Sequence, residues 1–500
     1  MHRRIQSRWV PRTLAILGTT AWLAAACKTQ PPPAIPLFQG SAETSVAAKP
    51  TRPPIVTNSF TADAVILPPD PEAQGFGAAI AVAQHVLVVG APQTRQTGAA
   101  WVFETNDLSK PPLCLLPPPG LQVKGFGASV AIEKSSHYIV IGAPASDVDG
   151  LSEAGRVFVW RRDGSAWTFV SAFQSNDPLE HSKLGSSVAI NQDSMIAGAP
   201  WTDIGSARSE GLALAWVRDP VKVWHLAQQM KLATTGPFAH FGNSIACVDR
   251  ITMHNLKPIS EALAVVGSPG AKTTGGSRVG TVSIFRSLKG KWRNIPTALL
   301  VSKDPESMDQ FGWSVAVHQE LIAAGAPNSN LPDVTDSGSA HVFRQGTDLG
   351  WREECEVHAF EPQRGSQFGF AVGFSKDRLV VGAPHARDEN LYECGRVFSY
   401  YAKPNASGYR TAWEPFCEIR PAALVAGGRF GACIAATDEL VAVSEPLAGR
   451  GRVHLFRATE TGFGIPSSAS RPPSAHEAAM KEAPAVPSGQ TAPPPAPSSL

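Results

Sequence analysis

Short apolar runs separated by glycine and proline follow one another along most of the chain, between residues 75 and 456. A typical unit begins with a run of small and β-branched residues (127–132), continues with a nearly unbroken apolar run (138–141), and ends with an aromatic-rich run (156–160). Runs of this length and composition predict β-strands. The unbroken middle run is typical of a strand that is covered on both faces of its sheet. Helical periodicity is absent from this region, so we predict an all-β fold.

Seven copies of a three-part signature set the register of these strands. The first part is an aromatic residue, or once leucine, followed by glycine: Phe76-Gly77, Phe126-Gly127, Leu184-Gly185, Phe241-Gly242, Phe311-Gly312, Phe368-Gly369 and Phe430-Gly431. The second part is a Gly-x-Pro that ends the middle run, at Gly90, Gly142, Gly198, Gly267, Gly325 and Gly382, with Ser444 in place of this glycine in the seventh copy. The third part is a glycine with an aromatic residue five positions later, as in Gly155 and Trp160. The copies recur about every 50 to 70 residues, a period that indicates stacked or radially arranged repeats.

A fourth strand completes most units. Five of the units place a tryptophan near its start: Trp167, Trp224, Trp292, Trp351 and Trp413. We expect these five side chains to pack between neighbouring sheets rather than to contact a ligand. Four consecutive strands with short links form one antiparallel meander. Seven such sheets around one axis predict a seven-bladed β-propeller with four-stranded antiparallel blades.

The two ends of this region predict how the ring closes. The seventh unit ends after its third strand at Phe456, and a spare strand-like run lies at 62–67, ahead of the first unit. Placed as the fourth strand of the last blade, the spare run covers an open sheet edge and closes the ring. We therefore assign 61–464 to one propeller domain.

The repeated signature resembles the FG-GAP repeats found in the head of integrin alpha chains and in many bacterial surface or periplasmic proteins. The resemblance covers residues 62–458, and it implies the same seven-bladed propeller. Integrin-type repeats often hold calcium in an acidic loop between the first and second strands. Here that link is too short in most units, as at 191–193 and 437–439, and in the fourth unit we expect a plain insertion from Asp249 to Glu261. The fold alone does not name a function, because one propeller serves binding, assembly and catalysis.

The first 27 residues have the pattern of an export signal. Four arginines precede an apolar stretch at 14–26 that is too short to span a bilayer. Small residues before Cys27 resemble a bacterial lipobox, although Ala24 stands where leucine is usual. This resemblance implies that Cys27 is lipidated and attaches the chain to a membrane. Lys28 in the next position favours the outer membrane of a bacterial cell envelope, with the periplasmic or surface side left open. An ordinary cleaved signal peptide with an incidental cysteine and an uncleaved anchor are the alternatives.

Two Pro-rich segments flank the predicted propeller. Residues 28–60 and 465–500 are rich in proline and small residues, and neither holds enough apolar surface to offset its ordering entropy. We expect a disordered tether and a disordered tail. The whole chain is 43% hydrophobic and 17% charged with a formal net charge of +2. That balance gives no basic surface for nucleic acid, so we predict no nucleic-acid partner.

Acidic residues gather between the second and third strands. The pair Asp147 and Asp149 gives a weak match to a calcium loop, and the other interpretation is that these side chains cap loop backbone. In a meander of this order, these loops share one rim with the links between blades, and we expect any ligand to bind there. The ligand-binding candidates on this rim are Trp201, Asp203, Asp333, Asp336 and Asp388.

The chain contains no familiar catalytic or cofactor motif. It lacks GxSxG, HExxH and a phosphate-binding glycine loop, so we predict no catalytic residue and no cofactor. His341 and His454 fall in third strands, where packing is expected. Six cysteines follow Cys27 without a CxxC pair, and Cys394 and Cys417 are open to either a disulfide or free thiols.

Two functions from different classes remain. The first is a non-catalytic, lipid-anchored propeller that presents its loop rim to an unknown protein or glycan, as an adhesion, assembly or scaffold module. The alternative is a propeller enzyme, hydrolase-like or lyase-like, with its active site at the mouth of the central channel. The sequence favours the first.

Overall fold

The computed structural model describes residues 59–466, except 233–235, 255–256, 289, 389, 405–409, 422, 460–461 and 464. Cys27, the export signal, residues 28–58 of the tether and residues 467–500 of the tail lie outside this range. The described residues form β-strands and connecting loops, and no helix occurs among them.

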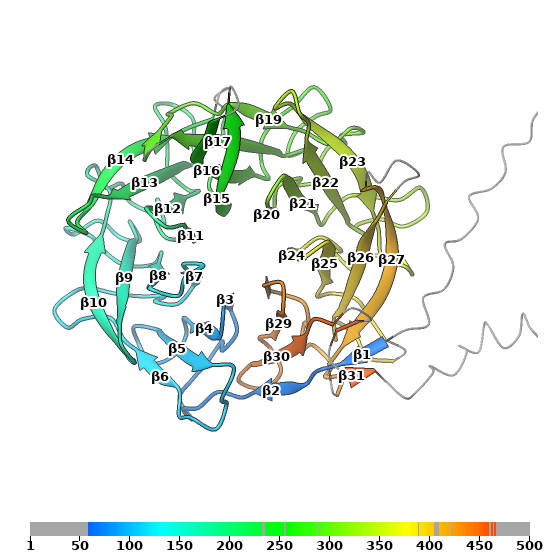
Figure 1. Ribbon diagram of the computed structural model, residues 1–500, viewed down its shortest axis with the longest axis horizontal. Coiled ribbons are helices and arrows are strands. Elements are labelled where there is room, and N and C mark those ends of the chain that lie inside the picture. The colour runs from blue at the N-terminus through cyan, green and yellow to red at the C-terminus, as the bar shows by residue number, and fades with distance from the viewer. Residues whose placement is uncertain are drawn as a thin grey trace, which may run out of the picture. The chain divides into compact units, whose positions relative to one another are not determined.

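Seven antiparallel sheets stand side by side in a ring, with the first strand of each sheet nearest the axis (Figure 1). The first blade is β3 (Ala79–Ala83), β4 (Val86–Ala91), β5 (Ala99–Glu104) and β6 (Leu113–Leu115). The second is β7 (Ser129–Ile132), β8 (Tyr138–Ala143), β9 (Arg156–Asp163) and β10 (Ala166–Phe173). The third is β11 (Ser187–Ile190), β12 (Ser194–Ala199), β13 (Leu212–Arg218) and β14 (Trp224–Met230).

The remaining blades follow the same order around the ring. The fourth is β15 (Ser244–His254), β16 (Lys257–Ser268), β17 (Thr281–Leu288) and two short outer strands, β18 (Lys291–Trp292) and β19 (Ala298–Leu300). The fifth is β20 (Ser314–His318), β21 (Leu321–Ala326), β22 (Ser339–Gln345) and β23 (Trp351–Val357). The sixth is β24 (Ala371–Ser375), β25 (Arg378–Ala383), β26 (Arg396–Pro404) and β27 (Arg410–Arg420). The seventh has β28 (Ile434–Ala436), β29 (Leu440–Glu445) and β30 (Arg452–Arg457) from the C-terminal unit. The predicted all-β, seven-bladed propeller is thus confirmed.

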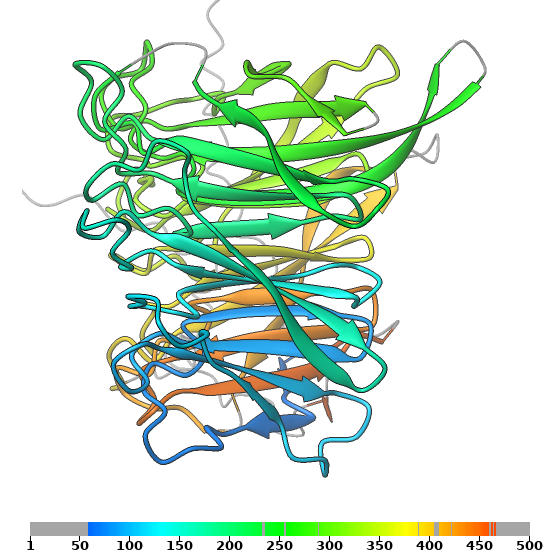
Figure 2. The ribbon, with the colours of Figure 1, turned by 90° about the vertical axis from the view of Figure 1, so that its left-hand side faces the viewer.

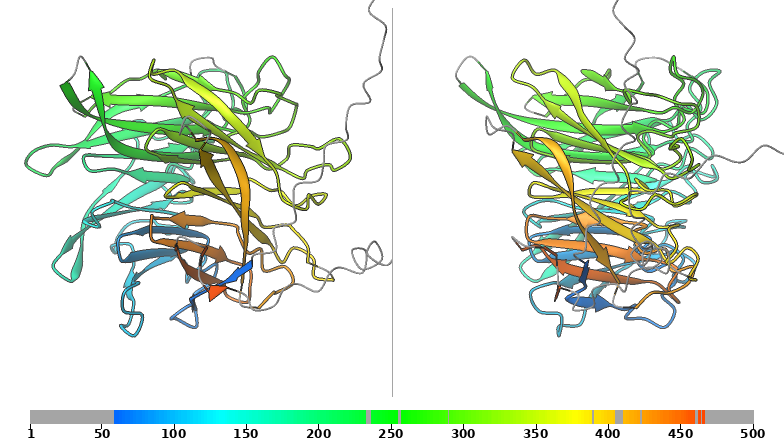
Figure 3. Two further views of the ribbon diagram at one scale, coloured as in Figure 1. Left: turned by 45° about the vertical axis from the view of Figure 1, so that its right-hand side comes forward. Right: turned by 90° about the vertical axis from the view of Figure 1, so that its right-hand side faces the viewer.

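The closing strand also lies where the sequence places it. β2 (Ala64–Ile66) pairs antiparallel with β30, Ala64 opposite Leu455 and Ile66 opposite Val453, and becomes the outermost strand of the seventh blade. Two further strands, which the sequence pattern does not reveal, lie beside it. β1 (Ser59–Thr61) extends the sixth blade parallel to β27, and β31 (Ile465–Pro466) pairs with β1 (Figure 3). The paired region therefore reaches slightly beyond 61–464 at both ends.

The repeated signature forms the seams between blades. In the seam between the second and third blades, Gly155 bridges in parallel to Leu184, and the Ser129 hydroxyl donates to the Gly185 carbonyl oxygen at 2.7 Å. A Cβ on Gly142 would lie 2.0 Å from that same oxygen, so only glycine fits there. Equivalent contacts recur around the ring, which explains why glycine returns at one position of the repeat.

Apolar side chains fill the space between blades. The middle strands β4, β8, β12 and β21 are buried at every position, as expected for strands covered on both faces. The aromatic residue of the first signature is fully buried and meets the aromatic residue of the third edge to face. Phe126 and Trp160, for example, have ring centroids 5.4 Å apart at an interplanar angle of 75°. Burial of each such ring stabilises the fold by about 1.5–3 kcal/mol.

The insertion expected in the fourth blade forms a hairpin. The segment from Asp249 to Glu261, expected as a plain insertion, continues the ladder of β15 and β16 as a long hairpin, with Asp249 opposite Ala262 and Ile251 opposite Ser260. The green strands of this hairpin project from one face of the ring in Figure 2.

Candidate functional site

The two faces of the ring differ in their connections. Links between blades and loops between second and third strands emerge on one face, which we call the loop rim (Figure 2). Turns between first and second strands and between third and fourth strands emerge on the other, which we call the hairpin face. Every ligand-binding candidate from the sequence lies in a loop of the loop rim.

Side-chain acceptors shape the loops of this rim. Asp147 Oδ1 accepts the backbone N–H of Glu153, Asp203 Oδ1 accepts that of Ser209, and Asn330 Oδ1 accepts that of Asp336. The spacing is six residues each time. The acceptor thereby holds the loop in a compact shape, which is the capping role that short polar side chains commonly fill.

Asp147 and Asp149 have protein partners. Asp147 Oδ2 lies 3.0 Å from Lys124 Nζ, and this hydrogen bond together with the Glu153 N–H lowers the pKa of Asp147. Asp149 Oδ2 accepts from Gln174 Nε2 at 3.3 Å. No group of three or more His, Cys, Asp or Glu side chains in the described part of the chain is arranged to hold a metal.

A hollow of about 530 Å³ lies on the rim between the second and third blades, and we call it the rim groove. Its wall joins one loop each from the second and third blades with the links that precede and follow the third blade: Glu153, Glu180, His181, Lys183, Trp201, Asp203, Arg208, Ser209 and Phe238. Trp201 and Asp203, both predicted from the sequence, are therefore brought together in one hollow.

Trp201 presents an aromatic face in this groove. Its side chain is 48% exposed and is supported from behind by His240, whose ring centroid lies 4.6 Å away. Lys183 Nζ lies 5.5 Å from the indole centroid, close enough for a cation–π contact. Burial lowers the pKa of His240, which favours a neutral ring under the indole.

Charged groups surround the indole. Glu153 Oε2 lies 3.2 Å from His181 Nδ1 and 3.5 Å from Lys183 Nζ, and the His181 contact is the main reason that the pKa of Glu153 is lowered. Glu180 and Arg208 are exposed and have no ion-pair partner among the described residues. The groove thus offers an aromatic platform beside free donors and acceptors, a combination suited to binding a polar partner.

Phe238 is a groove residue that sequence reasoning missed. Its ring is 47% exposed, its φ is +60°, and its N–H donates to the Arg208 carbonyl. A bulky residue in the left-handed region is uncommon, but nothing in the sequence marks this backbone conformation. The only available signal was a phenylalanine inside a polar link between blades.

The other candidates are placed apart from the groove. Asp333 and Asp336 are exposed on the rim of the fifth blade. Asp388, in the sixth blade, is only 9% exposed, and its Oδ2 lies 3.5 Å from Arg420 Nη1. Asp388 is therefore held by its own blade and is poorly placed to meet a ligand.

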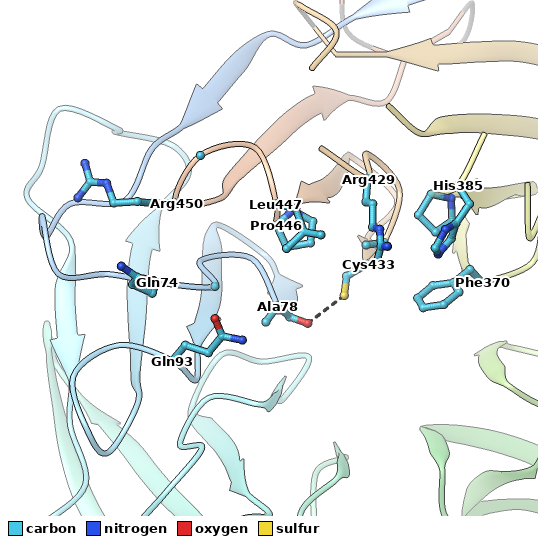
Figure 4. Close-up of a pocket in the computed structure, with 14 residues that line it drawn as sticks. Gln74, Ala78, Gln93, Phe370, His385, Arg429, Cys433, Pro446, Leu447 and Arg450 are labelled. Atoms are coloured by element: carbon cyan, nitrogen blue, oxygen red, sulfur yellow. Dashed lines mark hydrogen bonds between the residues drawn. The ribbon is translucent and has the colours of Figure 1, made fainter. Parts of the chain in front are cut away.

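A second hollow, of about 340 Å³, opens on the loop rim where the first, sixth and seventh blades meet (Figure 4). Phe370 and His385 face Gln74 and Gln93 across it, with Arg429 and Cys433 between them. Glu393 contacts two of the basic side chains, since its carboxylate lies 2.8 Å from Arg429 Nη2 and 3.5 Å from His385 Nδ1. The Cys433 thiol donates to the Ala78 carbonyl at 3.1 Å, and burial raises its pKa to about 11. This thiol is not an activated nucleophile.

One buried relay resembles catalytic machinery. Ser339 Oγ lies 3.0 Å from His341 Nε2, and His341 Nδ1 lies 2.7 Å from Glu353 Oε1, as in a Ser-His-acid triad. However, Ser339 is 0% exposed and His341 2%, and Ser329 Oγ contacts the serine at 2.8 Å. A substrate would have to open the blade to reach this hydroxyl, so we assign the relay a structural role. His454 with Glu445 at 2.9 Å is a second buried pair of this kind.

The cysteines of the propeller are all free thiols. None of the six forms a disulfide, and Cys394 and Cys417 are both buried. Of the two alternatives that the sequence left open, the structure therefore has the free thiols.

Comparison with known proteins identifies the repeat. Residues 296–343, from the outer edge of the fourth blade to β22 in the fifth, match the model of the FG-GAP repeat. The ring is an FG-GAP-like propeller. No curated protein matches the chain of this propeller. Among solved structures, Kluyvelomyces marxianus Hsv2 is similar at 10% identity and a TM-score of 0.42, over 78% of this chain and 96% of that one. A likeness at this level supports no functional argument. Within the described range of the FG-GAP-like propeller, no helix has the length and hydrophobicity needed to cross a membrane.

Proposed function

We propose that this FG-GAP-like propeller is a non-catalytic binding or scaffold module that presents its loop rim to a protein or glycan. In this proposal a lipid on Cys27 attaches the chain to the bacterial cell envelope, at the outer membrane, and the tether separates the ring from the bilayer. The rim groove is the contact site. Adhesion and assembly are the two biological uses that fit such a surface.

One observation supports the proposal above all. Trp201 and Phe238, 48% and 47% exposed, reach the same groove from the β12–β13 loop and from the link between the third and fourth blades. Exposed aromatic side chains beside unpaired charges are typical of the centre of a binding site. Sugars stack on such rings through their apolar faces, and proteins insert side chains between them. The seams of the ring hold the two loops in fixed relation, so the aromatic pair is preorganised.

Partner capture tests the groove directly. The purified chain, carrying a photo-crosslinker, is incubated with envelope extracts and separately with a glycan array. We expect Trp201→Ala to weaken capture by about 30-fold, because truncation of a central aromatic anchor costs about 2 kcal/mol. Trp201→Phe should retain most of the binding. Tyr392→Ala is the matched control, since Tyr392 is 62% exposed on the rim of the sixth blade.

The comparison also shows where the proposal fails. Equal capture by wild type and Trp201→Ala excludes the groove, and loss of capture in Tyr392→Ala alone moves the site to the sixth blade. Asp333→Ala reports on the fifth blade in the same experiment. No capture of any protein or glycan by the wild type refutes the binding function.

The membrane anchor needs its own experiment. We expect the wild-type chain, expressed in a bacterium with an outer membrane, to fractionate with that membrane, and Cys27→Ser to become soluble. Mass spectrometry of the N-terminal peptide detects the acyl chains. A soluble wild-type chain with an unmodified Cys27 contradicts the anchor without affecting the proposed role of the rim.

A further inference from the structure

A larger cavity lies on the hairpin face, away from the rim groove. Its volume is about 820 Å³, and its lining comes from turns of the first four blades. Gln84, Glu133 and Gln192 come from the inner turns of three successive blades. Arg161 and Lys222 come from the outer hairpins of the second and third blades. We call this hollow the basic cavity.

Positive charge predominates in its lining. Five side chains are cationic and two are acidic: Lys134, Arg161, Arg162, Arg218 and Lys222 against Glu133 and Asp249. Two of the arginines already have partners. Arg162 Nη2 lies 2.6 Å from Glu104 Oε1, and Arg218 bonds to the Gln192 carbonyl while it stacks on Tyr138 at 4.3 Å.

Three cations remain available to a ligand. Lys134, Arg161 and Lys222 are exposed, line the cavity and have no ion-pair partner among the described residues. Arg218 forms one wall of the cavity. Its guanidinium is held by two aromatic rings, since it stacks on Tyr138 and lies 5.6 Å from the Trp224 ring centroid. The cations come from two blades, so the seam between these blades sets their separation.

Glu133 is the independent sign that the cavity is a binding site. Its residue is 4% exposed, it lines the cavity, and its Oε2 has no hydrogen-bond partner. An unsatisfied buried carboxyl oxygen is costly and rare in native proteins. Burial raises the pKa of Glu133, although Ser135 and Arg218 oppose this shift. A ligand hydroxyl that bonded to Oε2 would satisfy the group that the protein leaves without a partner.

We propose that the basic cavity binds a polyhydroxyl ligand that carries a phosphate group, with the phosphate on Lys134, Arg161 and Lys222 and a hydroxyl on Glu133. A phosphate group offers two strong acceptor oxygens and one negative charge as a diester, or three such oxygens and nearly two charges as a monoester, and either form suits a cluster of cations. Arginine binds it with two parallel hydrogen bonds and lysine as a point charge. A cavity of this volume also holds a sugar-sized body. Acidic Glu133 disfavours a bare anion and selects a ligand with donors beside its charge.

The ligand chemistry has two possible sources, a soluble sugar phosphate and the headgroup of a phospholipid with a polyol. Isothermal titration with glucose 6-phosphate, glucose and inorganic phosphate examines the first, on the purified full chain. Co-sedimentation with vesicles of phosphatidylglycerol or phosphatidylcholine examines the second. We expect glucose 6-phosphate or phosphatidylglycerol to bind, and glucose and phosphatidylcholine not to bind.

Variants assign the binding to named groups. Arg161→Gln with Lys222→Gln should weaken binding at least about tenfold, because each removes a charge-assisted hydrogen bond. Lys272→Gln with Arg278→Gln removes the same charge from the loop rim and should leave binding unchanged. Glu133→Gln should weaken binding of the sugar phosphate and should leave binding of inorganic phosphate unchanged or stronger, since Glu133 disfavours a bare anion and only the sugar places a polyol hydroxyl at this position.

The outcomes that overturn the proposal are equally specific. Absence of binding in both arms overturns it, and so does binding that the Arg161 and Lys222 double variant retains. An equal loss of sugar phosphate and inorganic phosphate in Glu133→Gln removes Glu133 from the site. Thermal unfolding of each variant without ligand separates lost binding from lost folding. Partner capture at the rim groove is independent of all these results.

Discussion

The strand that closes the ring gives the sharpest test of the fold. Ile66 is 6% exposed and packs in the core between the seventh and first blades, where Val453 and Leu455 also lie. Its neighbour Leu67 is 63% exposed. Ile66→Ala removes the same kind of apolar group as Leu67→Ala, but from the core rather than from the surface. We expect Ile66→Ala to cost about 2–5 kcal/mol and Leu67→Ala less than about 0.5 kcal/mol.

Urea unfolding followed by tryptophan fluorescence measures both variants. Ile66→Ala should lower the urea midpoint clearly, while Leu67→Ala should follow the wild type. Deletion of 58–70 removes β1 and β2 together and should lower the midpoint further, because β30 then loses its outer partner and the Asp63 N–H bond to the Leu455 carbonyl at 2.8 Å. Equal midpoints for Ile66→Ala and Leu67→Ala, or an unchanged midpoint after the deletion, would refute the closure by β2.

Three other predictions follow from packing and charge. Gly142→Ala should destabilise the fold by about 1–3 kcal/mol, because its Cβ would meet the Gly185 carbonyl at 2.0 Å, whereas Gly236→Ala has open space and should be neutral in the same urea assay. Burial raises the pKa of Asp309 from 3.8 to about 6, so its favourable contribution is complete below pH 3.8 and is lost as the pH rises through 6. Asp309→Asn should therefore gain stability over the wild type by up to about 3 kcal/mol at pH 7.5 and almost none near pH 4, and a pH-independent difference would contradict this. Since the six cysteines are free, a reducing agent should leave the midpoint unchanged, and a drop would indicate a disulfide.

The fold was predictable because its determinants repeat. Six of the seven middle strands end with glycine, and six of the seven units begin with an aromatic residue, as Gly90 and Phe126 illustrate at one seam. A requirement that returns this often leaves a visible period in the sequence. The closing strand was predictable by counting strands. The seventh unit has only three, and the strand-like run at 62–67 belongs to no unit. β1 and β31 were not, because three and two residues of pairing leave no pattern.

The site was less predictable because it depends on single residues. Trp201 is identifiable from the sequence, because it is an aromatic residue in a rim loop, directly after a Gly-Ala-Pro. Phe238 could not be identified from the sequence, because its place in the groove depends on a left-handed backbone conformation. Glu133 could not be identified either, because the cavity that it lines forms only when turns of several blades come together in the fold. Asp388 was predicted to be a ligand-binding residue because it is an acidic residue in a rim loop. In the structure it is nearly buried, and its side chain contacts Arg420 while its N–H bonds to the loop backbone. Loop composition therefore locates the rim but does not tell a capping carboxylate from a free one.

The closing strand β2 and the rim groove lie in different parts of the ring. Variants at the two places therefore distinguish an effect on fold stability from an effect on binding. Gly185, which Gly142→Ala would displace, follows Lys183 of the rim groove by two residues. We expect Gly142→Ala to weaken partner capture as well as stability, because a shift at this seam moves Lys183 relative to Trp201. Ile66→Ala should lower stability while leaving capture by the folded fraction unchanged, since its contacts belong to the seventh and first blades. If both variants impaired capture in proportion to their loss of stability, the seam beside the groove would have no specific effect on binding. The argument that this seam preorganises the aromatic pair would then fail.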